Sequence, residues 1–467
     1  MMKKRLNRRD FLKKSGTAGL GMALGSMAIG KNGGIRQRQL ETEPIEHLFT
    51  PPIETVQVGY VGIGNQGSGH LRNLLRIEGV EIKAVCDIRE ERTLWAQEQC
   101  EKAGKPKPTA YNKGNEDFKR MCDSEDLDLV YNATPWEWHV PISVKAMETG
   151  SHAASEVPGA ITVEGCWELV ETSEKYKKHC CTMENCNYDR TELMLFNMVR
   201  QGLFGELLHA ECGYLHDLRE WKFGQAYYPH DWRLQYSIKR NADLYPTHGL
   251  GPVAQWMDIT RGNKFEYLVS MSSPSRSLKL EAIRRYGKDH PLAKTDYALG
   301  DVVSTLIKTN KGQTVLVTHD TNSPRPYSRR ILIQGTKGLA RKYPEEKIYL
   351  EGISLPHRWD DISTDYIGKG NHYTFYRDQY KHPLLTSLEE KAEGAGHGGM
   401  DFIEDYRLIQ CLREGKPTDS DVYEGATISA VVSLSEKSIA EKSTSVEFPD
   451  FTRGKWKTRK PLGIVTA

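Results

Sequence analysis

Three glycines that could bind a nucleotide phosphate follow the first apolar run of the chain. Gly62, Gly64 and Gly67 form the pattern Gly-x-Gly-x-x-Gly directly after the predicted strand Val56–Val61 and before a predicted helix. Glycines at these positions allow a tight turn and bring backbone N–H groups close to a pyrophosphate at the helix N-terminus. Asp87 ends the next predicted strand, 20 residues after Gly67. Its carboxylate would accept hydrogen bonds from ribose hydroxyls and repel a 2′-phosphate, so the pattern predicts NAD rather than NADP; a glycine turn without a ligand is the alternative.

Polar and aromatic residues follow three further predicted strands. The strand 127–133 leads into Thr134-Pro135-Trp136-Glu137-Trp138-His139, the strand 152–156 leads into Val157-Pro158-Gly159, and a third apolar run leads into Glu184-Asn185. Because the carboxyl ends of parallel strands form the ligand crevice of an open α/β sheet, we expect these residues to face the dinucleotide.

A polar stretch of 30 residues, 216–245, is unusually rich in aromatic side chains. Aromatic faces with polar edges suit a sugar, because its C–H face is apolar and its hydroxyls need hydrogen bonds. Arg219 and Arg233 could hold an acetamido carbonyl or an acidic group. A small aromatic core under a long loop is the alternative, and both interpretations can hold together. The aromatic residues are Trp221, Phe223, Tyr227, Tyr228, Trp232, Tyr236 and Tyr245.

His248 is the strongest acid/base candidate. It precedes a predicted helix, 249–258, and at a helix N-terminus the dipole favours a neutral imidazole that can accept a proton; a histidine that only caps the helix is the alternative. Tyr188 is a second acid/base candidate, or a packing residue. No metal site is expected, since His209, His216 and His230 show no ligand spacing.

The apolar pattern predicts two domains that position these residues. Short apolar runs alternate with helical segments over residues 55–185, which is typical of βαβ units and predicts an α/β domain with a doubly wound parallel sheet of the Rossmann type. Residues 186–467 predict an α+β domain with an open, mostly antiparallel sheet. Further strands are expected at 80–87, 207–214, 265–271, 302–308, 314–318 and 330–334, and helices at 89–103, 140–149, 163–178, 401–414 and 423–442.

Composition excludes several classes of protein. Hydrophobic residues make up 38% of the 467 residues, which is too many for a disordered chain. The formal charge is +2, but residues 1–31 hold eight Lys or Arg against one acid, so the remainder is net acidic and a nucleic-acid partner is not expected. Nine cysteines without a Cys-x-x-Cys pair exclude a disulfide scaffold and a zinc ribbon.

The first 31 residues resemble a twin-arginine (Tat) export signal. Arg8 and Arg9 precede Phe11-Leu12-Lys13, and a glycine-rich apolar stretch follows that is too short to span a bilayer. A disordered basic arm is the alternative. Residues 32–54 read as a linker. The expected location is periplasmic or otherwise extracytoplasmic, and a route for folded proteins would suit a tightly held cofactor.

The motifs together resemble the Gfo/Idh/MocA oxidoreductase family. In ordinary members the middle residue of the Glu-x-Pro motif is a lysine that acts as the catalytic acid/base, whereas this chain has Val157, which cannot transfer a proton. That departure, with Asn65-Gln66, Trp136-Glu137-Trp138-His139 and the motif Asp243-Leu-Tyr-Pro-Thr-His248, resembles glycoside hydrolase family 109, whose members are NAD-dependent α-N-acetylgalactosaminidases. The resemblance covers nearly all of the chain after residue 55.

The resemblance implies two sets of binding residues. Asn65, Gln66, Asp87, Trp136, Glu137, Trp138, His139, Glu156, Val157 and Asn185 would contact the dinucleotide, beside the glycine turn and Thr134. Tyr214, Arg233, Tyr245, Pro246, Thr247, His248 and Tyr327 would surround the sugar. Family members with exposed open sheets often pair through them, which leaves both a monomer and a homo-oligomer open for this chain.

The expected reaction is release of α-linked N-acetylgalactosamine by oxidation, elimination, addition of water and reduction, with NAD recycled in each turnover. His248 is the expected base, Tyr188 or Tyr245 would assist, and Glu156 would position the nicotinamide or the hydroxyl on carbon 3. An NAD-dependent sugar dehydrogenase of the Gfo/Idh/MocA type is the alternative enzyme, and a non-catalytic sugar-binding protein is the alternative outside enzymes.

Overall fold

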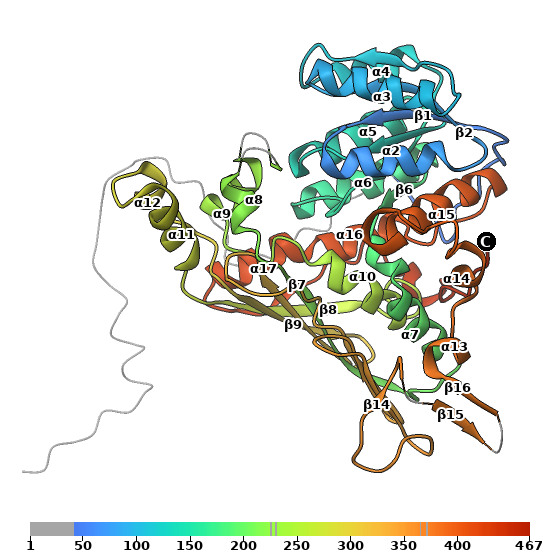
Figure 1. Cartoon of the computed structure of the whole chain (residues 1–467), viewed down its shortest axis with the longest axis vertical. Coiled ribbons are helices and arrows are strands. Elements are labelled where there is room, and N and C mark those ends of the chain that lie inside the picture. Colours follow the sequence, from blue (N-terminus) through green and yellow to red (C-terminus); the bar gives the residue numbers. More distant parts are fainter. Residues whose placement is uncertain (1–41, 225–226, 229–230, 365, 370–371) are drawn as a thin grey trace, which may run out of the picture. The chain divides into compact units, whose positions relative to one another are not determined.

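The computed structural model describes residues 42–224, 227–228, 231–364, 366–369 and 372–467 (Figure 1). The predicted export signal, residues 1–31, lies outside the described residues, as does the first part of the predicted linker. In the part of the chain that is described, no helix has both the length and the apolar character needed to cross a membrane.

A six-stranded sheet forms the N-terminal half, in the order β3-β2-β1-β4-β5-β6, and all its pairs are parallel, as predicted. The order reverses between β1 and β4, which places a ligand crevice at the carboxyl ends of these strands. The strands are β1 (Val56–Val61), β2 (Val80–Cys86), β3 (Thr109–Tyr111), β4 (Leu129–Asn132), β5 (His152–Ser155) and β6 (Cys180–Thr182). The helices are α2 (Asn65–Leu75), α3 (Glu90–Lys102), α4 (Asp117–Ser124), α5 (His139–Glu148) and α6 (Val163–Tyr176), with the short turns η1 (Trp136–Trp138) and η2 (Asn185–Tyr188).

A second sheet of nine strands forms the C-terminal half, in the order β14-β13-β12-β11-β7-β10-β9-β8-β17. The predicted mostly antiparallel pairing is confirmed, because β7 and β10 are parallel and the other neighbours are antiparallel. The strands are β7 (Leu207–Leu215), β8 (Phe265–Ser272), β9 (Val303–Thr309), β10 (Thr314–Asp320), β11 (Leu332–Gly335), β12 (Gly338–Arg341), β13 (Lys347–Leu350), β14 (Asp360–Asp361) and β17 (Val446–Glu447); β15 (Tyr366–Lys369) and β16 (His372–Phe375) form a separate hairpin.

Helices fill the space between the two sheets (Figure 1). α10 (Thr247–Trp256) packs on β7, α17 (Val431–Ala440) packs on β8, and α16 (Val422–Ser429) contacts both α10 and α6. The predicted helix 423–442 is therefore two helices, because α16 ends at Ser429 to pack on α6 and α17 turns along the second sheet. Further helices of the chain are α7 (Arg190–Arg200), α11 (Ser277–Tyr286), α12 (Pro291–Lys294), α13 (Tyr376–Gln379) and α14 (Pro383–Leu388).

The C-terminal part of the chain returns to the first sheet. α15 (Met400–Glu414) packs against α2 and η2. Residues 42–54 also attach to this region, through hydrogen bonds from the Thr50 and Ile53 N–H groups to the carbonyls of Gly415 and Leu412. The half that holds the parallel sheet is therefore completed by residues from the end of the sequence.

Candidate active site

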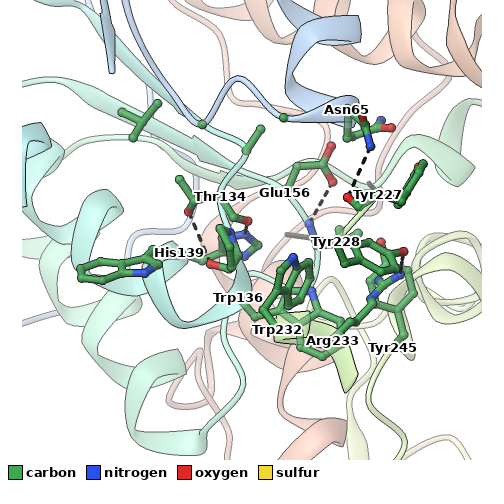
Figure 2. A pocket seen from close by; sticks show the side chains of 18 of the residues that line it. Asn65, Thr134, Trp136, His139, Glu156, Tyr227, Tyr228, Trp232, Arg233 and Tyr245 are labelled. Carbon is green, nitrogen blue, oxygen red and sulfur yellow. Dashed lines mark hydrogen bonds between the residues drawn. The ribbon is translucent and has the colours of Figure 1, made fainter. Parts of the chain in front are cut away.

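A cavity of about 610 Å³ opens at the carboxyl ends of β1, β2, β4 and β5, and the aromatic stretch and α10 form its other wall (Figure 2). Seventeen of the predicted site residues line this one cavity. On the sheet side these are Gly62, Gly64, Asn65, Gln66, Asp87, Thr134, Trp136, Trp138, His139, Glu156, Val157 and Asn185, and opposite them are Tyr214, Arg233, Tyr245, His248 and Tyr327.

The glycine turn fits a phosphate because each glycine meets a different constraint. Gly62 has φ +87, and a Cβ there would lie 2.7 Å from the carbonyl of Ala133. A Cβ on Gly67 would lie 2.1 Å from the carbonyl oxygen of Gly62, whereas a Cβ on Gly64 would meet no protein atom within 4 Å. No side chain caps the first turn of α2, so its N–H groups remain available to an anion.

Asp87 holds the same turn from the end of β2. Its Oδ2 accepts a hydrogen bond from the Ile63 N–H at 2.8 Å, and its Oδ1 accepts from the Arg89 N–H at 2.9 Å. The Arg89 side chain also contacts Oδ1, at 3.3 Å. Asp87 is thus a fixed carboxylate in the cavity wall, where the open space beside Gly64 and the uncapped helix fit a dinucleotide.

His139 ties two of the strand ends together. It is fully buried, and its Nδ1 and Nε2 lie 2.7 and 2.8 Å from the carbonyl oxygens of Pro158 and Thr134. Burial lowers the pKa of His139, despite the contacts with the two carbonyls. Its ring therefore fixes the shape of the cavity floor.

Arg233 lies inside a box of aromatic rings (Figure 2). Its guanidinium carbon is 4.6 to 5.6 Å from the ring centroids of Trp136, Tyr228, Trp232 and Tyr245, and its Nη1 donates to the Tyr228 hydroxyl at 2.5 Å. In the part of the chain that is described, Arg233 forms no ion pair with a carboxylate. A buried cation without an acidic partner suits an oxygen-rich ligand.

His248 lies in the first turn of α10 and contacts a buried carboxylate. Its Nδ1 is 2.8 Å from the Oε1 of Glu184, which also accepts a hydrogen bond from the Cys186 N–H. Burial alone would raise the pKa of Glu184, but the neighbouring His248 outweighs it and the net pKa is lowered. With Nδ1 held by Glu184, Nε2 is the nitrogen left for proton transfer.

The same region contains a set of ligand atoms that could hold a metal ion. One atom each from Glu184, Cys186 and His248 lie within 4.8 Å of one another. However, Glu184 already bonds His248, and burial raises the pKa of the Cys186 thiol well above its usual value. These contacts indicate a carboxylate–imidazole pair, Glu184 and His248, beside the neutral thiol of Cys186.

Some predicted residues do not line the cavity. The Tyr188 hydroxyl contacts Asp419 Oδ2 at 3.1 Å and is buried away from the cavity. Arg219 pairs with Asp217 instead. Gly67, Glu137, Pro246 and Thr247 are absent from the lining, and Glu137 accepts from the Tyr236 hydroxyl. These residues support the cavity rather than facing it.

The expected long loop contains two helices, α8 (Arg219–Phe223) and α9 (Trp232–Lys239). Trp221, Tyr227, Tyr228 and Trp232 line the cavity, whereas Phe223 packs in a separate cluster with Tyr297. Both interpretations of the aromatic stretch therefore hold, since it forms a wall of the cavity and a small core of its own.

Several residues of the site had a different predicted role or none. Glu184 was expected to face the dinucleotide, but it lies outside the cavity lining and contacts His248 instead. His397 lies in the glycine-rich turn before α15, Met400 is the first residue of α15, and neither carries a recognisable signal in the sequence. The other lining residues without a predicted role include Arg89, Asn115, Cys186 and His216.

Two family models match the chain. Residues 56–184 match the oxidoreductase family, NAD-binding Rossmann fold, and residues 188–458 match the C-terminal domain of glycosyl hydrolase 109. The N-terminal half is therefore an NAD-binding Rossmann domain.

Curated relatives match over nearly the whole length. A glycosyl hydrolase family 109 protein of Shewanella pealeana is 44% identical over 469 residues, and an alpha-N-acetylgalactosaminidase of Shewanella oneidensis is 44% identical over 470 residues; each alignment covers 99% of both chains.

Solved structures show the same fold at low identity. A levoglucosan dehydrogenase in complex with NADH and levoglucosan has a TM-score of 0.60 at 18% identity and covers 85% of this chain and all of its own. A scyllo-inositol dehydrogenase from Lactobacillus casei with bound NAD(H) and scyllo-inositol has a TM-score of 0.57 at 15% identity, covering 84% of this chain and 99% of its own. With both domain models and the full-length relatives in agreement, the chain belongs to glycosyl hydrolase family 109.

Proposed function

We propose that this protein is a glycosidase that releases terminal α-linked N-acetylgalactosamine and that it uses NAD as a recycled cofactor. The observation that carries the proposal is the single cavity in which the dinucleotide cradle and the aromatic wall with His248 meet. The 44% identical relative named alpha-N-acetylgalactosaminidase supports the choice of sugar.

Residues of one cavity wall would bind the dinucleotide, and residues of the other wall would bind the sugar. Asn65, Asp87 and the glycine turn would hold the dinucleotide, which when bound supplies reversible hydride acceptance and so makes the hydrogen next to the oxidised sugar carbon acidic. Arg233 would bind an oxygen of the sugar within its aromatic box. Tyr214 and Tyr245 meet the ring of His248 edge-on, with centroids 5.3 and 4.8 Å away, and would fix it against the sugar.

His248 is the proposed base that removes the proton from carbon 2. Glu184 orients the imidazole and stabilises its charge once it is protonated, as a buried carboxylate does for a catalytic histidine. Elimination of the group on carbon 1, addition of water and return of the hydride to the oxidised carbon would then complete the release and restore the cofactor. Glu156 lies in the same wall and would receive the proton of the sugar hydroxyl, because Val157 cannot.

Turnover of an aryl α-N-acetylgalactosaminide in heavy water tests the proposal. Release of the sugar with deuterium at carbon 2 supports the elimination route, and release without deuterium indicates either direct displacement or internal return of the same proton. Failure to release any N-acetylgalactosamine from an enzyme that retains NAD contradicts the glycosidase itself. Stoichiometric NADH formation with a free sugar would favour the sugar dehydrogenase instead, although buried Val157 at the lysine position speaks against that alternative.

Export by a Tat-type signal is a second part of the proposal. All nine cysteines are free and buried. Folding before export would protect them from incorrect disulfides in an oxidising compartment, and a twin-arginine route carries folded proteins. Replacing Arg8 and Arg9 by lysine should leave the protein in the cytoplasm, as measured by cell fractionation; unchanged export would contradict this route.

The third part of the proposal is that two copies of the chain pair through the second sheet. One face of this sheet carries Met271, Tyr267 and Leu306, which are 62%, 40% and 50% exposed on neighbouring strands β8 and β9. An apolar face of this kind suits a second copy of the chain. A monomeric mass in light scattering would contradict it.

A further inference from the structure

His70 is a buried histidine whose ring joins two carboxylates. It lies in the second turn of α2 and is 1% exposed. Its Nε2 is 2.9 Å from the Oε1 of Glu156, and its Nδ1 is 2.8 Å from the Oδ2 of Asp405. Glu156 lines the cavity, whereas Asp405 is fully buried behind it on α15. The three side chains therefore form one line from the core to the cavity.

Asp405 is held in place by groups from two other elements. Asn73 donates to its Oδ2 at 2.9 Å, and the Tyr131 hydroxyl of β4 donates to its Oδ1 at 2.9 Å. At the other end, Glu156 Oε2 accepts from the Val157 N–H at 3.2 Å. The fold therefore fixes Asp405, and the His70 ring together with the Val157 N–H orients the Glu156 carboxylate.

A ring that contacts a carboxylate through each nitrogen is best satisfied as imidazolium, with both nitrogens donating. Burial alone would lower the pKa of His70, but Asp405 and Glu156 outweigh it and raise this pKa well above its usual value. Burial would likewise raise the pKa of Glu156, but the hydrogen bond and charge of His70 outweigh it and lower this pKa. The pair thus keeps a carboxylate ionised at a site where burial would neutralise it.

Several other polar and titratable groups surround His70 and Glu156. The titratable neighbours on α15 are Asp401 and Glu404, besides Asp405, and the turn before it adds His397. Tyr60 and Tyr131 face the pair from the first sheet, and Gln66 Nε2 lies 3.0 Å from His70 Nε2. Burial, together with the neighbouring carboxylates, raises the pKa of Glu404 well above its usual value, against the lowering effect of His70. Asp401 bonds His397 and Asn185. Among the described residues, His70 is the cation that forms an ion pair with Glu156.

We propose that His70, held by Asp405, is a positioning residue that keeps Glu156 oriented as the proton acceptor for a substrate hydroxyl. This inference rests on the proposed function and deepens it, because it names the residues that position Glu156 as the proton acceptor. The hydroxyl O–H bond breaks, its proton passes to a Glu156 oxygen, and the electron pair stays on the substrate oxygen. The proton returns along the same path when the hydroxyl is restored, and His70 keeps its own proton throughout.

The variant His70→Gln tests this role, since glutamine can still donate to Glu156 but has no charge. In this variant the pKa of Glu156 should be higher than in the wild type. The acid limb of the pH profile of kcat/KM should therefore shift to higher pH by about one unit or more. We expect kcat to fall at least about tenfold and the dinucleotide content of the purified protein to stay at the wild-type level. His382→Gln is the matched control, because His382 is equally buried, lies outside the cavity lining and should leave the acid limb in place.

A double-mutant cycle separates positioning from simple loss of stability. If His70 acts through Glu156, the combination His70→Gln with Glu156→Gln should be no slower than Glu156→Gln alone. Additive losses, or an unchanged acid limb in folded His70→Gln, would overturn the proposal. Asp405→Asn should move the limb in the same direction as His70→Gln, and it serves if the latter does not fold.

An infrared titration of the Glu156 carboxylate, identified by its absence in Glu156→Gln, gives a readout that needs no substrate. A higher titration midpoint in His70→Gln supports the positioning role, and an equal midpoint overturns it. If the wild-type enzyme fails to release N-acetylgalactosamine while the midpoint still moves, then the proposed function fails and the positioning of Glu156 stands.

Discussion

The Nδ1 of His248 lies 2.8 Å from the Oε1 of Glu184, although 64 residues separate them in the chain. The contact joins the first turn of α10 to the end of β6, and it therefore links the two halves of the molecule. A carboxylate in this position fixes the tautomer of the imidazole and stabilises its protonated form. In this arrangement His248 depends on Glu184 to act as a base.

Replacing Glu184 by glutamine should therefore slow the reaction without emptying the site. We expect kcat to fall by about 10² to 10⁴ with little change in KM, because the substrate contacts remain and only the support of the base is lost. Steady-state kinetics and deuterium incorporation at carbon 2 measure the effect. Cys186→Ala is the control, since Cys186 lies beside the same pair but offers no carboxylate; near-normal turnover of Glu184→Gln would refute the pairing.

Removal of metal ions should leave the activity unchanged. Glu184, Cys186 and His248 have a spacing that could hold a cation, but their mutual hydrogen bond and the raised pKa of the thiol favour the metal-free pair. Dialysis against a chelator, followed by elemental analysis and an activity assay, checks this. Loss of activity that returns with a divalent cation would show that the three residues act as ligands.

Much of the fold could be predicted from local patterns. The parallel sheet follows from apolar runs that alternate with helical segments, and the glycine turn with Asp87 depends on residues close in sequence. The two helices α16 and α17 were expected as one, because the break at Ala430 serves packing against α6 and leaves no Gly or Pro signal. Tertiary packing decided that boundary.

The site was predictable where each residue belongs to a local motif and unpredictable where it depends on pairing. His70, Glu184 and Asp405 are ordinary polar residues in sequence, and only the fold brings His70 and Asp405, 335 positions apart, into contact. Tyr188 was predicted as a second acid/base candidate, but the turn η2 directs its hydroxyl to Asp419. Sequence spacing does not determine on which side of such a turn a side chain emerges.

Asp243 should make the protein less stable as the pH rises. Burial raises its pKa to about 7, and its Oδ2 has no hydrogen-bond partner among the described residues. Since the unfolded chain releases this proton near pH 4, the folded state binds the extra proton between about pH 4 and 7, and stability falls across that window. Asp243→Asn should flatten this dependence by on the order of 1–4 kcal/mol at pH 8, measured by denaturant unfolding. Exposed Asp296→Asn is the control, and an unchanged pH dependence in Asp243→Asn would contradict the assignment.

Arg233 should be needed for substrate binding and poorly replaced by lysine. A planar guanidinium fits between four rings and can bond an oxygen with its remaining N–H groups, whereas an ammonium cannot stack in the same way. We expect kcat/KM to fall about 10- to 100-fold in both Arg233→Lys and Arg233→Met. Arg219→Met is the matched control from the same segment, because Arg219 pairs with Asp217 outside the cavity. If Arg219→Met lowers kcat/KM as much as the Arg233 variants do, the effect of replacing Arg233 is structural.

The glycine turn allows binding of NAD to be separated from folding. Gly64→Ala should fold normally, because the new Cβ meets no protein atom within 4 Å, yet this Cβ would project beside the first turn of α2 where a phosphate would lie. We expect the dinucleotide released from denatured protein to fall at least about tenfold, with the melting temperature of the dinucleotide-free protein unchanged. Gly69→Ala is a matched control in the same helix, since its Cβ also meets no atom within 4 Å, and it should retain the full content. Gly67→Ala should fail differently, by destabilising the turn itself, because its Cβ would lie 2.1 Å from the Gly62 carbonyl oxygen. If Gly64→Ala retains NAD as well as Gly69→Ala does, the dinucleotide does not lie over this turn.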